Sequence, residues 1–200
     1  MYKNIIFDMS EVIITGIHGA EKEIESTFGI KANEYENRRI KVNEVFLDLM
    51  RGKLTEEEYM AVLIAGTGWN ISGNDIKKVI RDYLGRPIPG TKEIIQKLKG
   101  KYNLILLSDY PLEWKNEVLK NRKEMQLFDK MFFSCDFGLV KADIDCFEHI
   151  INTAQIKPEE TIFIDDYENN VKNAEKIGIK GIIFKNANDL EEKLTELKIL

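Results

Sequence analysis

The chain has 200 residues, of which 44% are hydrophobic, and its formal net charge is −5 at pH 7. This length suits one domain, or one domain with an insertion, and the apolar content suffices for a core. No block of lysine and arginine stands out, which argues against nucleic-acid binding. The longest apolar runs have about five residues, far fewer than a membrane span needs. Two cysteines outside any C-x-x-C pair, and a first strand with no signal peptide ahead of it, favour a cytoplasmic protein with buried thiols.

Five short apolar runs predict β-strands, at 5–8, 104–107, 131–133, 161–164 and 181–184. Helical patterns accompany the later strands, at 91–99, 112–125, 144–154, 168–177 and 188–197. Strands that alternate with helices of this length indicate an α/β fold with a Rossmann-like parallel sheet and right-handed crossovers. Such sheets bind ligands beyond the carboxyl ends of their strands.

One stretch breaks this alternation. Between the first and second strands the pattern is helical, at 21–28, 35–51, 55–65 and 75–83. Thr55-Glu56-Glu57-Glu58 is a capping-box pattern that starts a helix, and a linker rich in proline and glycine at 85–90 leads back to the core. We therefore expect an α/β core formed by residues 1–15 and 86–200, with a helical cap at 16–85.

Acidic residues stand directly after two of the apolar strands. Asp8 follows the first strand, and Asp165 and Asp166 follow the fourth. Carboxylates in such places cost stability unless something compensates them, and Mg²⁺ binds sites of this kind. Taken singly, Asp8 also fits a surface carboxylate in a loop, and Asp166 fits the N-cap of the next helix. Together they predict a Mg²⁺ site in which one carboxylate is a candidate nucleophile for phosphoryl transfer.

Two further residues follow this pattern. Ser108 ends the second strand, and Lys141 precedes the helix at 144–154. A hydroxyl with the backbone N–H groups after it can hold a phosphate oxygen, and a lysine there would offset the carboxylates. Each residue also has an ordinary explanation, a serine that caps a turn and a lysine exposed to solvent.

The order and spacing of these four segments resemble the haloacid dehalogenase-like (HAD) superfamily of phosphohydrolases, and the resemblance covers the whole chain. The four segments are Phe7-Asp8-Met9-Ser10-Glu11-Val12, Leu106-Leu107-Ser108-Asp109, Gly138-Leu139-Val140-Lys141-Ala142-Asp143 and Phe163-Ile164-Asp165-Asp166-Tyr167-Glu168-Asn169-Asn170-Val171. The helical insertion then resembles the family's cap, which closes over the site and selects the substrate. The chain is most similar to the helical-cap (C1) phosphatase branch, and within it to sugar-1-phosphate phosphatases.

The resemblance implies how the acidic residues act. Asp8 attacks phosphorus and becomes an aspartyl-phosphate, which water then hydrolyses. Mg²⁺ is held by the Asp8 carboxylate, the backbone carbonyl of Ser10 and Asp166. Asp165 acts through a bound water or by supporting the ligands.

The resemblance also implies how phosphate is held. Ser108, the backbone N–H of Asp109 and Lys141 grip the phosphoryl oxygens. Asn170 supports the metal-binding turn.

The sequence departs from the family pattern at four positions. Most phosphatases of the family carry a second Asp two residues after the nucleophile, which protonates the leaving group, and here that residue is Ser10. A positioned acid or base is worth roughly 10²–10⁴-fold in rate. Glu11 replaces a small residue, so either Glu11 or a cap carboxylate such as Glu44 is a candidate for the missing acid, unless Glu11 points to solvent. Asp109 replaces the usual Asn and Ala142 the usual Pro, and a charge at 109 that faces inward would weaken anion binding.

These observations favour a Mg²⁺-dependent phosphohydrolase acting on a small phosphate monoester, such as a sugar phosphate. A catalytically weak or inactive binding protein of the same fold is the main alternative, because of Ser10. A 2-haloacid dehalogenase is a further alternative, although those enzymes lack the acidic pair. The expected partner is a small phosphorylated metabolite, with no nucleic acid and no membrane, in a monomer or a dimer. Trp114 is expected to pack in the interior, and Arg51 to face either solvent or an anionic substrate.

Overall fold

The computed structural model of the protein describes residues 1–29 and 43–200. Its centre is a five-stranded parallel sheet with the strand order β3-β2-β1-β4-β5. The strands are β1 (Asn4–Phe7), β2 (Asn103–Ser108), β3 (Lys130–Phe133), β4 (Thr161–Asp165) and β5 (Lys180–Ile183). β1 is the middle strand and pairs with β2 on one side and β4 on the other. The predicted parallel α/β sheet is therefore confirmed.

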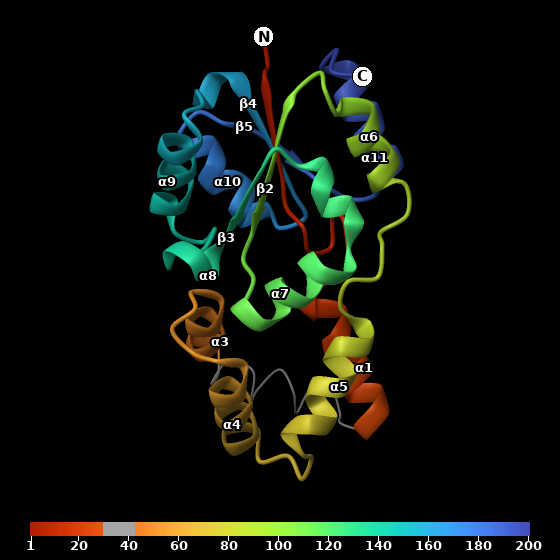
Figure 1. The fold of residues 1–200 in the computed structure, drawn as a ribbon, viewed down its shortest axis with the longest axis vertical. Coiled ribbons are helices and arrows are strands. Elements are labelled where there is room, and N and C mark those ends of the chain that lie inside the picture. The colour runs from red at the N-terminus through yellow and green to blue at the C-terminus, as the bar shows by residue number, and fades with distance from the viewer. Residues whose placement is uncertain (30–42) are drawn as a thin grey trace.

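Helices cover both faces of this sheet (Figure 1). On one side lie α6 (Thr91–Leu98), α7 (Leu112–Asn121) and α11 (Ala187–Glu196), and on the other lie α9 (Ile144–Ala154) and α10 (Glu168–Lys176). Successive side chains of a strand point to opposite faces. In β1, Ile5 and Phe7 accordingly join one buried cluster while Ile6 joins the other. Burial on both faces is the reason why the strands read as continuous apolar runs.

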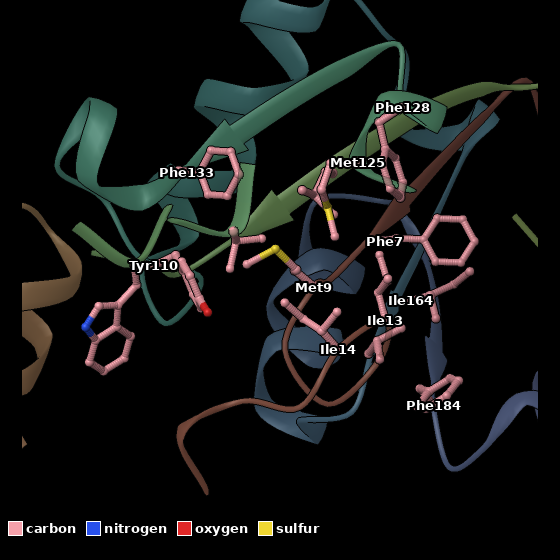
Figure 2. Close-up of a cluster of buried hydrophobic side chains, with 14 of the residues drawn as sticks. Phe7, Met9, Ile13, Ile14, Tyr110, Met125, Phe128, Phe133, Ile164 and Phe184 are labelled. Atoms are coloured by element: carbon pink, nitrogen blue, oxygen red, sulfur yellow. The ribbon is translucent and has the colours of Figure 1, made fainter. Parts of the chain in front are cut away.

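The larger cluster continues beyond the strand ends toward the site. Figure 2 shows Phe7 with Met125 and Phe128, and Met9 beside Ile14 and Tyr110. Phe7 and Phe128 meet edge to face, with ring centroids 6.0 Å apart. Apolar side chains of this cluster therefore pack against the loop after β1 and hold the loop in one position.

Four described helices lie together beyond the carboxyl ends of the strands (Figure 1). They are α1 (Ile17–Phe28), α3 (Asn43–Met50), α4 (Glu56–Thr67) and α5 (Gly73–Tyr83). The predicted capping box is present, since Thr55 Oγ1 accepts a bond from the N–H of Glu58 and the Glu58 carboxylate accepts one from the N–H of Thr55. The first part of the helix predicted at 35–51 lies outside the described residues. None of the helices in the described ranges is long and apolar enough to cross a membrane.

Two details differ from the sequence prediction. The helix predicted at 112–125 ends at Asn121, because Arg122 adopts an extended conformation, and a 3₁₀ turn at Lys123–Leu127 follows. This break lets Met125 and Phe128 enter the core. A short helix, α8 (Ser134–Phe137), was not predicted, since a single turn carries no periodic pattern.

Candidate active site

Three carboxylates meet where β1 and β4 end. The register pairs Phe7 with Ile164, and the N–H of Asp8 donates to the carbonyl of Ile164 at 2.8 Å. The residues that follow in each strand are therefore neighbours. One carboxylate oxygen each from Asp8, Asp165 and Asp166 lies within 4.8 Å of the others. The structure thus brings together the three acidic residues that the sequence singled out.

Lys141 lies between two of these carboxylates. Its Nζ is 2.7 Å from Asp8 Oδ1 and 2.7 Å from Asp165 Oδ2, and the residue is only 3% exposed. The interpretation of Lys141 as a solvent-exposed lysine is therefore wrong. Burial lowers the pKa of Lys141, but Asp165, Asp8 and Asp109 outweigh this effect, so the pKa is raised and the ammonium stays charged.

Asp165 and Asp166 have different surroundings despite being adjacent. Asp165 is fully buried and accepts bonds from the N–H of Tyr167 at 2.7 Å and from Asn170 Nδ2 at 3.1 and 3.2 Å, besides the bond from Lys141. Asp166 is only partly buried. Asp165 is therefore suited to anchor the turn, and Asp166 to offer oxygens to a ligand.

The crowding of like charges affects ionisation. Burial raises the pKa of Asp8 well above its usual value, Lys141 opposes this, and Asp165 and Asp166 add to the rise. Burial and the Asp165 charge also raise the pKa of Asp166. A divalent cation between Asp8 and Asp166 would stabilise both ionised forms, and oxygen donors of this kind suit Mg²⁺. The residues present therefore fit a magnesium ion.

Beside this group lies the end of β2. Ser108 is fully buried, and its Oγ forms no hydrogen bond with any residue in the described ranges. A buried hydroxyl without a partner is costly, and a phosphoryl oxygen would supply one. Asp109 turns its side chain inward, where both carboxylate oxygens lie 3.1 Å from the backbone N of Lys141. Burial raises the pKa of Asp109 to about 6, against the lowering effect of Lys141.

The loop after Asp8 connects the site to α1. Glu11 has a left-handed backbone with φ 59°, and its Oε1 accepts a bond from the N–H of Gly16, directly before α1, at 2.9 Å. The Glu11 carboxylate thus contacts protein rather than solvent alone. Ser10 is half-buried in the same loop, and Glu44 is exposed on α3. None of these positions supplies an evident replacement for the missing acid.

The sequence did not indicate the residues that join α4 and α5 to α7. Glu56 is 7% exposed, and its carboxylate accepts bonds from Trp114 Nε1 at 2.7 Å and Arg81 Nη2 at 2.8 Å. It thereby links α4 and α5 to α7. Trp114 is buried as predicted. Arg51 lies 3.2 Å from Asp143, so it faces a carboxylate of the core.

Comparison with known proteins agrees with this geometry. The chain is 26% identical to a flavin mononucleotide hydrolase of Arabidopsis thaliana, over 98% of this chain and 77% of the relative. It is 24% identical to a D-ribitol-5-phosphate phosphatase of Bacteroides thetaiotaomicron, over 98% of both chains. A HAD family enzyme of Bacteroides thetaiotaomicron, solved in complex with magnesium and inorganic phosphate, superposes with a TM-score of 0.74 at 25% identity, covering 93% of this chain and 96% of that one. The family model of haloacid dehalogenase-like hydrolases matches residues 2–178, and the chain belongs to that family.

Proposed function

We propose that the protein is a Mg²⁺-dependent phosphohydrolase that transfers a phosphoryl group from a small phosphate monoester to Asp8 and then to water. The observation that carries this proposal is the placement of Lys141, 2.7 Å from both Asp8 and Asp165, with Asp166 beside them. The phosphatase names of the relatives, and the magnesium and phosphate in the structural neighbour, support it.

The chain's own groups divide the work as follows. Asp8 Oδ1 accepts bonds from the N–H of Met9 at 2.6 Å and from Lys141, which leaves the second oxygen of Asp8 to attack phosphorus. Ser108 Oγ, the N–H of Asp109 and the Lys141 ammonium hold the phosphoryl oxygens. Magnesium, held by Asp8, Asp166 and the carbonyl of Ser10, would supply charge neutralisation at the transferred group.

Two alternatives are less well supported. Dehalogenation needs no metal, and it gives no reason for the acidic pair Asp165 and Asp166 beside Asp8. A binding protein without turnover would have no need of a lysine buried between the carboxylates of Asp8 and Asp165. Such groups are expensive to bury and are typical of catalytic sites.

The remaining expectations extend this proposal. The division into a core of residues 1–15 and 86–200 and a cap of residues 16–85 stays a prediction, as do a cytoplasmic location and a monomeric or dimeric state. We infer that the substrate is a small phosphorylated metabolite that enters between cap and core. Sugar phosphates, polyol phosphates and flavin mononucleotide are the first classes to screen, in view of the relatives.

The test is hydrolysis of an aryl phosphate with Mg²⁺ and after its removal by EDTA. An aryl leaving group hardly needs a proton, so Ser10 does not prevent its release. We expect turnover with Mg²⁺, none after EDTA, and none in Asp8→Asn. Asp189→Asn, the same change in α11 outside the site, should retain full activity. No turnover by the folded wild-type protein with Mg²⁺, or full turnover by Asp8→Asn, would refute the proposal.

A further inference from the structure

A single buried hydroxyl joins the candidate phosphate-binding loop to the cap. Ser134, the first residue of α8, is fully buried. Its Oγ accepts a bond from the N–H of Tyr110 at 3.0 Å and donates one to the carbonyl of Met50 at 2.5 Å. Tyr110 directly follows Ser108 and Asp109, and Met50 is the last residue of α3. The hydroxyl is thus shared between the loop that faces phosphate and a cap helix.

The residues after Met50 rest on the same part of the core. Gly52 has φ 71°, and a Cβ at this position would lie 2.7 Å from the carbonyl oxygen of Cys135, so only glycine allows this approach. Arg51 pairs with Asp143, two residues after Lys141. The end of α3 therefore contacts the segment of Lys141 through Arg51 and Asp143, and it is linked to the segment of Ser108 through the Ser134 hydroxyl.

We propose that Ser134 is a positioning residue that links the seating of α3 on the core to the geometry of the loop formed by residues 108–110. This inference rests on the proposed function of the site. When α3 is seated, the Ser134 hydroxyl satisfies a buried carbonyl on the cap and a buried N–H on the loop together, and loss of either partner leaves a buried group unpaired. Seating of the cap and ordering of the loop then favour each other. By linkage, phosphate bound to the loop strengthens cap seating to the same degree that cap seating strengthens phosphate binding.

The test uses Ser134→Ala with inorganic phosphate and Mg²⁺ as the probe. Phosphate affinity is measured by calorimetry and by inhibition of aryl phosphate hydrolysis, and amide hydrogen exchange is followed at Tyr110 and residues 50–53. In the wild type we expect phosphate to slow exchange in both segments. In Ser134→Ala we expect the phosphate dissociation constant and KM to rise about tenfold while kcat changes less, as for loss of positioning. The phosphate-induced slowing at residues 50–53 should disappear.

Ser72→Ala is the matched control. Ser72 caps α5 through Asp75, and both its side-chain bonds stay within the cap. This variant should weaken the cap helix but leave the phosphate dissociation constant and the protection of residues 50–53 unchanged.

The proposal is overturned if folded Ser134→Ala binds phosphate like the wild type and phosphate still protects residues 50–53. If Ser134→Ala does not fold, Gly52→Ala takes its place, since the added Cβ displaces the end of α3 without touching the loop. Weaker phosphate binding and faster Tyr110 exchange in Gly52→Ala support the link, and wild-type values for both overturn it. Because calorimetry needs no turnover, failure of the phosphatase proposal would appear separately, as a wild type that binds phosphate but does not hydrolyse.

Discussion

Asp109 offers the sharpest test of the electrostatics of the site. Its carboxylate accepts the backbone N–H of Lys141 with both oxygens at 3.1 Å and lies near the charges of Lys141, Asp165 and Asp143. Burial raises the pKa of Asp109 from 3.8 to about 6. Asp109→Asn keeps an acceptor of the same shape and removes the charge, so it stands in for the protonated carboxyl at every pH.

The magnitude follows from linkage. Between pH 4 and pH 6 the folded state holds the Asp109 proton while the unfolded state has released it, so wild-type stability falls as pH rises through this window. A shift of about two pKa units corresponds to about 3 kcal/mol at 1.36 kcal/mol per unit. The variant does not suffer this loss. We therefore expect Asp109→Asn to match the wild type near pH 4 and to exceed it by up to about 3 kcal/mol at pH 8, and to bind phosphate more tightly there.

The assay is urea unfolding of both proteins from pH 4 to pH 8 without Mg²⁺, read as the difference in the free energy of unfolding. Asp129→Asn is a control of opposite sign. Partial burial raises the pKa of Asp129, but bonds from Lys99 and from the N–H of Leu104 outweigh it and hold the pKa below its usual value. The ionised Asp129 therefore adds to the free energy of unfolding at neutral pH, and this contribution is lost in acid. Asp129→Asn should accordingly be less stable than the wild type at pH 8. A difference for Asp109→Asn that does not change with pH would refute the reasoning.

Three further variants test other parts of the structure. Glu56→Ala removes one of the two carboxylates that pair with the half-buried Arg81 and leaves the buried indole N–H of Trp114 unpaired, so it should lower the free energy of unfolding by about 1–3 kcal/mol. Glu57→Ala, exposed in the same turn, should cost under about 1 kcal/mol in urea unfolding. Asn170→Ala removes the amide that holds Asp165, so the Mg²⁺ concentration for half-maximal activity should rise about 10–100-fold, and Asn169→Ala should leave it unchanged. Glu11→Gln should keep the wild-type pH–rate profile, since the Glu11 carboxylate is bonded to a backbone N–H of the cap; a lost limb in that profile would make Glu11 the missing acid after all.

The sequence predicts the sheet and the carboxylates well because both depend on short, local patterns. An apolar run that ends in Asp gives the strand and the position of Asp8 or Asp165 together, and parallel strands bring their carboxyl ends to one edge. Lys141 reaches the same point from the segment that follows β3, and its place before a helix left an exposed lysine as an equally ordinary interpretation until the resemblance assigned it to the site. The buried contacts that tie α3, α4 and α5 to the rest of the chain had no such pattern. Nothing in the local sequence marks Glu56 as the buried one of the three consecutive glutamates in the capping box. Ser134 lies in a single helical turn, and its two hydrogen-bond partners are 24 and 84 residues away in the sequence.

The bond between Trp114 and Glu56 gives this protein a built-in optical signal. The chain has two tryptophans, and Trp114 carries its indole N–H against a buried carboxylate of the cap. Any movement of α4 away from α7 would make that indole exchange the carboxylate for water, and the emission spectrum should then move to longer wavelength. A Trp69→Phe protein would report such a movement from Trp114 alone, without any attached dye. Stopped-flow mixing with substrate could time the movement directly against the chemical step.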